Sequence, residues 1–363
     1  MIFNYEPDIT KEDIDSVIDC LNSGIANPNH ILSVETELLK KFKSNSILTS
    51  SGTSALHLSL ISLGVGKGDE VICPSFTFAS TWNVIEYVGA TPIFVDSSPS
   101  TWCICVEDLI SKISKNTKAI IAVDIFGNPC DYSTLSQISK EFKIPIVGDC
   151  AESLGSTYKN KHVVTYPDIA CTSFNLNKIV TSCGGGAIFS NNKLIEKASR
   201  NMLNQNKKDK EYDYHGLGFN YRIGSINAML LISQIRRMDS ILDVKSKVHK
   251  TYIKNFIDVP EITFQKSTTD SIPNRWVTVI KFSEKIKRDR AHQALLTNKI
   301  ESKIPFKPAN LVKWISEKYN LNNARLKESK EIYERCLVLP SSPKISLQDI
   351  EKVTSVIRKS IIA

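Results

Sequence analysis

One lysine, Lys178, is followed by a short β-branched run and then by three consecutive glycines, in the segment SFNLNKIVTSCGGG (residues 173–186). Three successive glycines let the backbone approach a bulky ligand and adopt positive φ angles. A lysine held against such a wall loses part of its solvation, which lowers its pKa towards that of a nucleophilic amine. Two interpretations stay open for this segment alone: a lysine that forms a Schiff base with pyridoxal phosphate (PLP), or a surface loop with a solvated lysine.

Other groups match the remaining parts of a PLP site. The segment Ser51–Ser54 (SGTS) joins a short predicted strand to a predicted helix. Its N–H groups, its hydroxyls and the positive end of the helix dipole suit a phosphate, although an N-cap without a ligand has the same pattern. Asp149 ends a predicted strand, and an acid there would keep a pyridinium nitrogen protonated. Phe76 and Phe78 offer a face for the ring, although such residues more often belong to the core. Together with Lys178, these groups predict a PLP site.

The elements that must position these residues form an alternating α/β series. Short apolar strands are predicted within residues 70–78, 90–96, 119–126 and 144–149, with helices between them and another strand at 186–190. This alternation predicts a largely parallel sheet with buried strands. Ligands of such sheets bind beyond the carboxyl ends of the strands, where Asp96, Asp124 and Asp149 fall.

The pattern changes after a long predicted helix that runs from Ser225 past Tyr252. Amphipathic helices precede the α/β series at residues 10–21 and 31–42. After the long helix, strands at 276–282 and 300–303 alternate with helices at 288–298, 311–319 and 347–361. We therefore expect a large PLP-binding domain with an N-terminal arm (1–245) and a small C-terminal domain (246–363). His57, Trp276 and Trp314 are expected to be packed core residues.

Composition narrows the class of protein. The 363 residues carry a net charge of +8, and the basic residues are spread thinly along the chain. This charge suits an anionic small-molecule substrate as well as RNA. No segment has the pattern of a nucleic-acid-binding module. The nine cysteines are an odd number at irregular spacing, which argues against a disulfide framework and against a zinc site, so no metal is expected. There is no secretory signal pattern and no apolar stretch of membrane-spanning length, so a cytoplasmic protein is expected.

Taken together, the motifs resemble the sugar-nucleotide aminotransferases of the aspartate-aminotransferase-like PLP fold, and most of all those of the perosamine-synthase type. The resemblance covers nearly the whole chain and rests on motifs in the family's order, namely residues 66–78, 89–96 (GATPIFVD), 149–155 (DCAESLG), 173–178, 219–222 (FNYR), 300–303 (IESK) and 339–341 (LPS). It implies the fold type I of PLP-dependent transferases. In that fold a mostly parallel seven-stranded sheet lies between helices in the large domain, and the smaller C-terminal domain is α+β.

The same resemblance assigns roles to individual residues. Lys178 is implied as the Schiff-base lysine and general acid/base, and Asp149 as the partner of the pyridinium nitrogen. Phe78 matches the aromatic residue that stacks on the ring, and Glu152 a position beside the phenolic oxygen and the sugar. The residues implied as cofactor ligands on the phosphate side are Gly52, Thr53, Ser54 and Ser173, with Asn220 contributed by the partner subunit of a homodimer whose active sites lie at the interface.

Substrate contacts are implied for Glu152, Arg222, Lys303 and Asn310, although a structural salt bridge is an equal alternative for Arg222. Several of these positions depart from the family pattern: Lys303 stands for a frequent arginine, Asn310 for a frequent histidine, and Asp124 for another histidine. Cys183 and Gly184 also depart from the usual sequence after the lysine. None of these departures removes a residue of the PLP core, so they leave open which nucleotide and which sugar are used.

The function implied is transfer of an amino group from L-glutamate, through PLP, to a nucleotide-linked 4-keto-6-deoxy sugar, which would provide an amino sugar for a surface polysaccharide such as lipopolysaccharide. Two alternatives are a 3-keto sugar-nucleotide aminotransferase of the same fold and a non-catalytic PLP-binding regulator. A nucleotide-binding kinase is disfavoured because the chain lacks a Gly-x-x-x-x-Gly-Lys-Ser/Thr motif.

Overall fold

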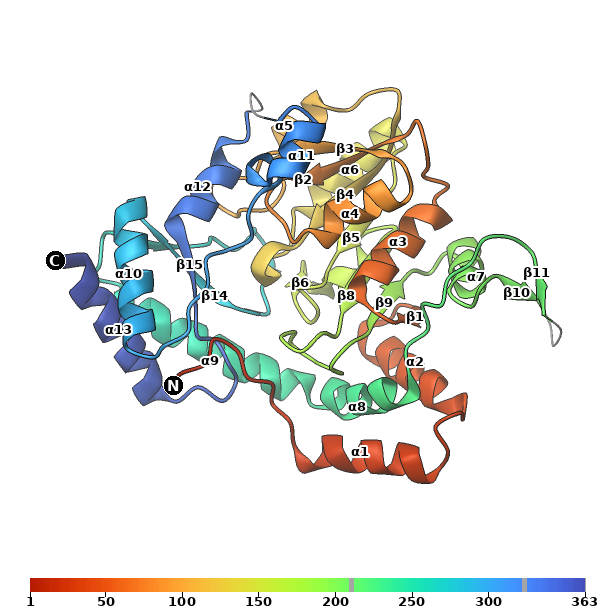
Figure 1. Cartoon of the computed structure of the whole chain (residues 1–363), viewed down its shortest axis with the longest axis horizontal. Helices are drawn as coiled ribbons and strands as arrows, with labels where there is room; N and C mark the ends of the chain where they lie inside the picture. The colour runs from red at the N-terminus through yellow and green to blue at the C-terminus, as the bar shows by residue number, and fades with distance from the viewer. Residues whose placement is uncertain (209–211, 322–324, 363) are drawn as a thin grey trace.

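The computed structural model describes residues 1–208, 212–321 and 325–362 (Figure 1). Its centre is a seven-stranded sheet with the order β1-β9-β8-β5-β4-β2-β3. The strands are β1 (Ser46–Thr49), β2 (Glu70–Pro74), β3 (Thr91–Val95), β4 (Thr117–Val123), β5 (Ile146–Asp149), β8 (Ile169–Ser173) and β9 (Gly186–Phe189). Strands β3, β2, β4, β5 and β8 pair in parallel, and β9 runs antiparallel to both of its neighbours. The predicted α/β fold with a mostly parallel seven-stranded sheet is confirmed.

Apolar runs explain why these strands are central. The last five residues of β4, Ala119–Val123, are all buried, as expected of a strand covered on both faces. Helix α3 (Gly52–Ser62) packs on β5, β8 and β9 and contacts α4 (Ser80–Tyr87) and α7 (Lys193–Met202). Helix α6 (Tyr132–Phe142) packs on β5. The carboxyl ends of β4, β5 and β8 therefore meet at one sheet edge, next to the first turn of α3.

The helices outside this core largely follow the predicted pattern. Helix α1 (Lys11–Asn22) begins with a capping box between Thr10 and Asp13, and α2 (Asn29–Phe42) follows it. Both helices pack against α8 (Ser225–Arg236). The prediction of one long helix from Ser225 is wrong, because the helix breaks at Arg237, where φ is −100°, and resumes as α9 (Met238–Phe256).

A second cluster of buried apolar side chains begins at Val248 in α9. It is built on the antiparallel sheet of β12 (Ile262–Phe264), β14 (Thr278–Phe282) and β15 (Cys336–Leu339), which α10 (Lys285–Thr297) and α13 (Leu347–Ile362) cover. The predicted strand at 300–303 is wrong, because its two ends make only single bridges, Ile300 to Ile2 and Lys303 to Val338. Trp314 was predicted to be core but is half exposed at 50%. The domain division at residue 245 stays a prediction.

Shorter elements complete the description. A hairpin of β10 (Lys207–Lys208) and β11 (Asp213–Tyr214) projects away from the large sheet (Figure 1). The others are α5 (Val106–Ser111), α11 (Lys313–Lys318), α12 (Lys327–Arg335), β6 (Thr157–Tyr158), β7 (Lys161–His162) and β13 (Ser271–Ile272), with 3-10 turns at Ile125–Gly127, Val163–Thr165 and Ala309–Leu311. Among the helices of the described residues, none is both long enough and apolar enough to cross a membrane.

One close approach holds β9 against the first turn of α3. Gly186 pairs with Thr49 on one side and Ser173 on the other. A Cβ atom at Gly186 would lie 2.6 Å from the backbone nitrogen of Gly52 and from the carbonyl group of Ser51. Only a residue without a side chain lets the strand and the helix terminus meet at this distance.

We therefore expect Gly186→Ala to lower the free energy of unfolding by about 2–3 kcal/mol, because the backbone must move to admit a methyl group. Gly66→Ala is the matched control, since a Cβ atom there would have only one neighbour, the carbonyl oxygen of Val88 at 4.0 Å. That control is expected to change stability within about 0.5 kcal/mol. Urea unfolding of both variants measures the difference, and equal midpoints would contradict the close packing.

Candidate active site

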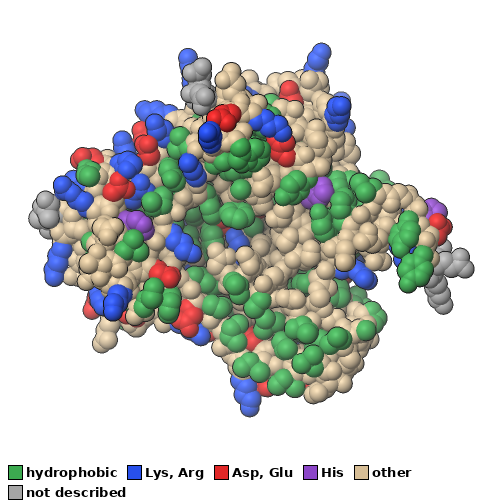
Figure 2. Space-filling view, viewed as in Figure 1, with side chains coloured by type: hydrophobic (Ala, Val, Ile, Leu, Met, Phe, Trp, Pro, Cys, Tyr) green, Lys and Arg blue, Asp and Glu red, His purple; other side chains and the backbone are tan. Residues whose placement is uncertain are grey.

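A cavity of about 310 Å³ lies where the carboxyl ends of the central strands meet the first turn of α3. On the face in Figure 2 the molecule is hollowed near its centre. The residues that line this cavity are Ser50, Ser51, Gly52, Thr53, Leu56, Thr77, Phe78, Ser80, Val123, Asp149, Ala151, Glu152, Ser173, Asn175, Asn177, Lys178, Gly184, Gly185, Trp276 and Phe306. The cavity therefore brings together seven of the nine residues predicted for the cofactor: Gly52, Thr53, Phe78, Asp149, Glu152, Ser173 and Lys178.

Asp149 places a buried carboxyl group in this cavity. It is the last residue of β5 and is 5% exposed. Its Oδ2 accepts a hydrogen bond from Thr81 Oγ1 at 2.8 Å, and its Oδ1 accepts from the backbone N–H of Ala151 at 3.2 Å. Burial raises the pKa of Asp149, while these two hydrogen bonds and the charge of Lys178 act in the opposite direction. A carboxyl group fixed in this way can hold a cationic ring nitrogen.

The first turn of α3 provides the anion-binding end of the cavity. Gly52 and Thr53 line it, and the side chain of Ser51 caps the helix by accepting a hydrogen bond from the backbone N–H of Ser54 at 3.0 Å. The positive end of the helix dipole therefore faces the cavity. Ser54 departs from the prediction: it is not among the lining residues, and its hydroxyl is hydrogen-bonded to those of Ser50 and Ser51.

Lys178 lines the same cavity as Asp149 and the first turn of α3. Its Nζ is 3.9 Å from Oε1 of Glu152 and 4.1 Å from the centre of the Trp276 ring, and its side chain is 14% exposed. Burial lowers the pKa of Lys178, although Glu152 and Asp149 raise it. The amine is therefore easier to deprotonate than an exposed lysine, as a nucleophile or a base requires.

Hydrogen bonds from three distant segments hold the loop that carries Lys178. The side-chain amide of Asn227 in α8 donates to the carbonyl of Ser182 at 2.6 Å. The indole N–H of Trp276 donates to the carbonyl of Asn177, and the hydroxyl of Tyr5 donates to the carbonyl of Lys178. The loop is thus fixed from α8, from the segment that precedes β14 and from the N-terminal arm.

Glu152 is the second acid beside the amine. It is 5% exposed, and its Oε2 accepts a hydrogen bond from the backbone N–H of Phe126 at 2.7 Å. Burial raises the pKa of Glu152 to about 7, against the opposing charge of Lys178 and the hydrogen bond from Phe126. Glu152 therefore changes protonation near neutral pH, beside the amine of Lys178.

The aromatic wall differs in part from the prediction. Phe78 lines the cavity and is 58% exposed, whereas Phe76 is 1% exposed and packs against Phe126 and Phe306 in the core. Residues two apart on an extended strand would point to the same side, but residues 75–77 form a bend, so the two rings face different surroundings. Trp276 is 5% exposed and belongs to the core, as predicted, and it also forms part of the cavity wall. His57 is packed, as predicted, against Phe219 and Tyr221.

The predicted substrate residues lie outside this cavity, apart from Glu152. Lys303 lines an adjoining hollow of about 190 Å³ that shares Asn177, Trp276 and Phe306 with the cavity. Asn310 accepts a hydrogen bond from the hydroxyl of Ser75 at 3.2 Å. Asp124 is fully buried and accepts hydrogen bonds from Tyr132, Ser153 and the backbone of Cys130, so it does not border a substrate.

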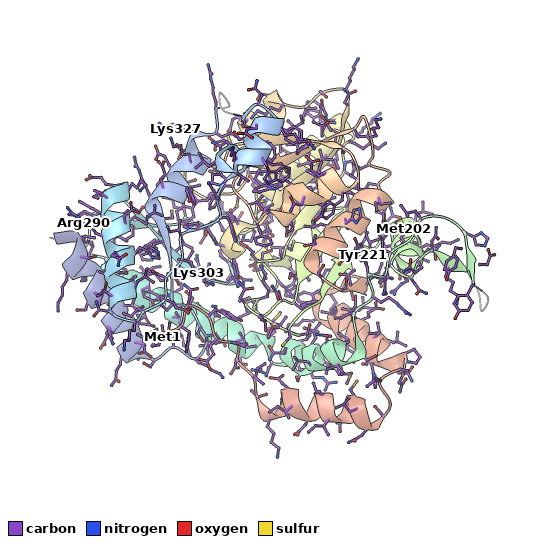
Figure 3. All side chains as sticks on the ribbon, viewed as in Figure 1. Met1, Met202, Tyr221, Arg290, Lys303 and Lys327 are labelled. Atoms are coloured by element: carbon purple, nitrogen blue, oxygen red, sulfur yellow. The ribbon has the colours of Figure 1, made fainter. Side chains whose placement is uncertain are left out.

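Asn220 and Arg222 are both exposed and follow the β10–β11 hairpin. Figure 3 shows Lys303 near the centre of the molecule and Tyr221, which separates Asn220 from Arg222, on the side of the hairpin. The chain's own cavity therefore does not include Asn220 or Arg222.

The residues present fit PLP. A buried carboxyl group, a partly desolvated amine and a helix N-terminus lie around one cavity, and they correspond to the ring nitrogen, the aldehyde and the phosphate of that cofactor. Phe78 and Trp276 add apolar surface for a ring. Within the described ranges, no group of three or more His, Cys, Asp or Glu side chains is arranged to hold a metal ion.

Known proteins resemble the whole chain. Residues 7–358 match the family described as the DegT/DnrJ/EryC1/StrS aminotransferase family. A GDP-perosamine synthase from Escherichia coli O157:H7 is 32% identical over 350 residues, which cover 95% of this chain and 94% of that protein. A UDP-2-acetamido-2-deoxy-3-oxo-D-glucuronate aminotransferase from Pseudomonas aeruginosa is 33% identical over 239 residues, which cover 63% of this chain and 66% of that protein. Among solved structures, Spr1654 from Streptococcus pneumoniae, a proposed sugar aminotransferase in its PLP form, has a TM-score of 0.91 at 28% identity and 98% coverage of both chains.

Glu152 gives a pH-dependent prediction for the cofactor-free protein. Burial raises its pKa from 4.5 to about 7, so the folded state holds this proton more tightly than the unfolded state. Its contribution to stability is full below about pH 4.5 and is lost as the pH rises through about 7. Glu152→Gln stays neutral, so relative to the unmodified protein it should gain about 2–3 kcal/mol of unfolding free energy between pH 5 and pH 8.

Urea unfolding of both proteins at the two pH values measures this gain. The other buried acids are present in both proteins, so their effects on the free energy of unfolding cancel in the comparison. A stability difference that is the same at pH 5 and pH 8 would contradict the raised pKa of Glu152.

Proposed function

Because the chain belongs to the DegT/DnrJ/EryC1/StrS aminotransferase family and is a PLP-dependent sugar aminotransferase of the perosamine-synthase type, we propose that it transfers an amino group from L-glutamate to a nucleotide-linked 4-keto-6-deoxy sugar. The predicted family, enzyme class and cofactor are confirmed by these matches. The observation that carries the proposal is that Lys178 lines one cavity together with the carboxyl group of Asp149 and the first turn of α3. The sugar and its keto position rest on the similarity to GDP-perosamine synthase.

Bound PLP supplies an electron sink for the carbon that carries the migrating amino group. The chain supplies the remaining functions. Asp149 would hold the proton of the ring nitrogen, and Gly52, Thr53 and Ser173 would hold the phosphate. The amine of Lys178, whose pKa burial lowers, would take a proton from one carbon and return it to the other.

We also propose that the active enzyme is a homodimer in which Asn220 reaches the phosphate in the partner's cavity. The position of Asn220 supports this, because it is exposed and lies outside its own chain's cavity. Apolar side chains near the site and the hairpin are also exposed, including Phe78 at 58%, Leu176 at 52% and Leu217 at 79%. A partner subunit would remove this apolar surface from water.

Substrate recognition is assigned to residues beside the cavity and to residues of the partner subunit. Lys303 lies beside the cavity and would attract the diphosphate of a sugar nucleotide. Arg222 would act in the partner's site, as Asn220 does. Asn310 is assigned to the substrate by resemblance. A cytoplasmic location, with the product destined for a surface polysaccharide such as lipopolysaccharide, fits the nine cysteines, which all lie in the described residues as free thiols.

A 3-keto sugar nucleotide is the alternative substrate. It is favoured by the similarity to the aminotransferase from Pseudomonas aeruginosa whose name specifies a 3-oxo sugar. NMR of the product distinguishes the two, because the carbon bonded to nitrogen is C4 in one case and C3 in the other. A non-catalytic PLP-binding regulator is a further alternative, and multiple turnover would exclude it.

We expect the visible absorption band of the PLP-loaded protein to disappear when L-glutamate is added, because the amino group moves to the cofactor. Lys178→Ala should lower kcat by at least about 10³-fold, since the proton transfers lose their acid/base. The control is Lys118→Ala, which removes an exposed lysine at the start of β4 and should leave kcat unchanged. A band that glutamate leaves intact would contradict the donor, and full turnover by Lys178→Ala would contradict the role of this lysine.

Shared active sites predict complementation between two defective variants. Lys178→Ala lacks the amine and Asn220→Ala lacks the proposed partner ligand, so each homodimer should be impaired. In a mixed dimer one site combines an intact Lys178 with an intact Asn220 from the other chain. Refolding an equal mixture should restore about a quarter of the native sites. Activity that only equals the average of the two separate variants would contradict a site shared between subunits.

A further inference from the structure

The N-terminal arm, residues 2–13, connects the small domain with the large one. Its first part is hydrogen-bonded to the small domain: Ile2 exchanges backbone hydrogen bonds with Lys299 and Glu301, and the backbone N–H of Asn4 donates to the carboxylate of Glu301 at 3.0 Å. The side chain of Asn4 donates to the carbonyl of Val338 at 3.3 Å. In Figure 1 the chain accordingly begins beside α9 and α13 and then runs to α1.

The second part of the arm is bound to the junction of α8 and α9. The guanidinium of Arg237 forms ion pairs with Asp8 and, at 2.7 Å, with Asp13. Gln234 donates to the carbonyl of Asp8 and to the carboxylate of Asp13, both at 2.9 Å. Asp13 is completely buried. Burial raises the pKa of its carboxyl group, but its hydrogen bonds and the charge of Arg237 lower the pKa further, so it stays below the usual value. The arm is therefore fixed at both ends.

Tyr5 lies between these two attachments and reaches the loop of Lys178. Its hydroxyl donates to the backbone carbonyl of Lys178 itself. Its ring lies 5.6 Å from the Nζ of Lys245, a lysine that is 2% exposed and donates to the carbonyl of Ser341 in the small domain. We propose that Tyr5 is a positioning residue for Lys178, which holds the lysine's backbone so that its amine stays in the dry part of the cavity.

The surroundings of the amine explain what this hydrogen bond would control. Two carboxyl groups act on the Nζ of Lys178: Glu152, at 3.9 Å, and Asp149. The indole of Trp276 covers the amine at 4.1 Å, and Lys303 lies in the adjoining hollow, which Tyr5 also lines. Burial is the largest influence on the pKa of Lys178 and lowers it. If the loop loosens, water reaches the amine and its pKa rises towards the ordinary value.

The uptake of PLP by the cofactor-free protein measures this pKa. Only the uncharged amine attacks the aldehyde carbon of PLP, forming a carbon–nitrogen bond as water leaves, so the uptake rate follows the neutral fraction of Lys178. The rate is recorded from the visible band between about pH 6 and pH 10. In Tyr5→Phe, which keeps the ring and loses only the hydroxyl, the half-point of the profile should move up by about one pH unit.

Tyr166→Phe is the matched control. Its hydroxyl also donates to a backbone carbonyl, that of Tyr158 at 2.6 Å. Tyr166 is partly buried like Tyr5, but it lines neither the cavity nor the adjoining hollow that Tyr5 lines. This variant should keep the half-point of the unmodified protein. A purely structural role of Tyr5 would reduce the amount of folded protein without moving the half-point, so an unchanged half-point in folded Tyr5→Phe would overturn the proposal.

If Tyr5→Phe does not fold, Asn4→Ala decides instead. It removes the side-chain hydrogen bond to Val338 and leaves Tyr5 in place, so it should move the half-point in the same direction by a smaller amount. No movement would overturn the proposal.

The inference rests on the proposed role of Lys178. Different results would contradict the role of Lys178 and the role of Tyr5. If Lys178→Ala still forms the same visible band with PLP, the proposed role of Lys178 is wrong. If Tyr166→Phe moves the half-point as far as Tyr5→Phe does, only the proposed role of Tyr5 is wrong.

Discussion

The amine of Lys178 and the carboxyl groups of Asp149 and Glu152 share one poorly hydrated cavity, and the rest of the structure depends on that arrangement. Burial lowers the pKa of the amine and raises the pKa values of both acids, so it works against charge on all three groups. Only a few fixed hydrogen bonds, such as those from Thr81 to Asp149 and from Phe126 to Glu152, offset this effect. A cofactor with a cationic ring nitrogen would place a positive charge beside the carboxyl group of Asp149, and its phosphate would place a negative charge at the first turn of α3.

The fold produces this arrangement by bringing separate chain ends to one edge. In the register of the sheet, Val123 in β4 lies beside Asp149, and Asp149 lies beside Cys171 in β8. The first turn of α3 adds the anion-binding end, and Gly186 lets β9 pass close to it. No single segment forms the site.

Local patterns predicted much of this from the sequence. The apolar runs predicted the strands of the sheet. SGTS, Asp149 and Lys178 each follow a strand or begin a helix, so the sequence also indicated that they meet at one edge of the sheet. The positions of Trp276 and Tyr5 could not, because each reaches Lys178 only through tertiary packing, and nothing in their own neighbourhoods marks them. Phe76 and Phe78 show a similar limit: residues two apart share one side of an extended strand, and the bend at 75–77 that separates the two rings does not follow from their spacing. Arg237, where the long helix breaks, likewise has distant partners, Asp8 and Asp13.

The bridge between Ile2 and Ile300 has a consequence for the order in which the chain folds. A ribosome releases the N-terminus first, yet the partners of residues 2–4, at 299–301, 338 and 341, are synthesised more than 290 residues later. The pairing of β1 with β9 likewise waits for residues 186–189. Contacts between residues so far apart in sequence form slowly. Residues 2–4 therefore leave the ribosome long before the residues that bind them, and they dock late.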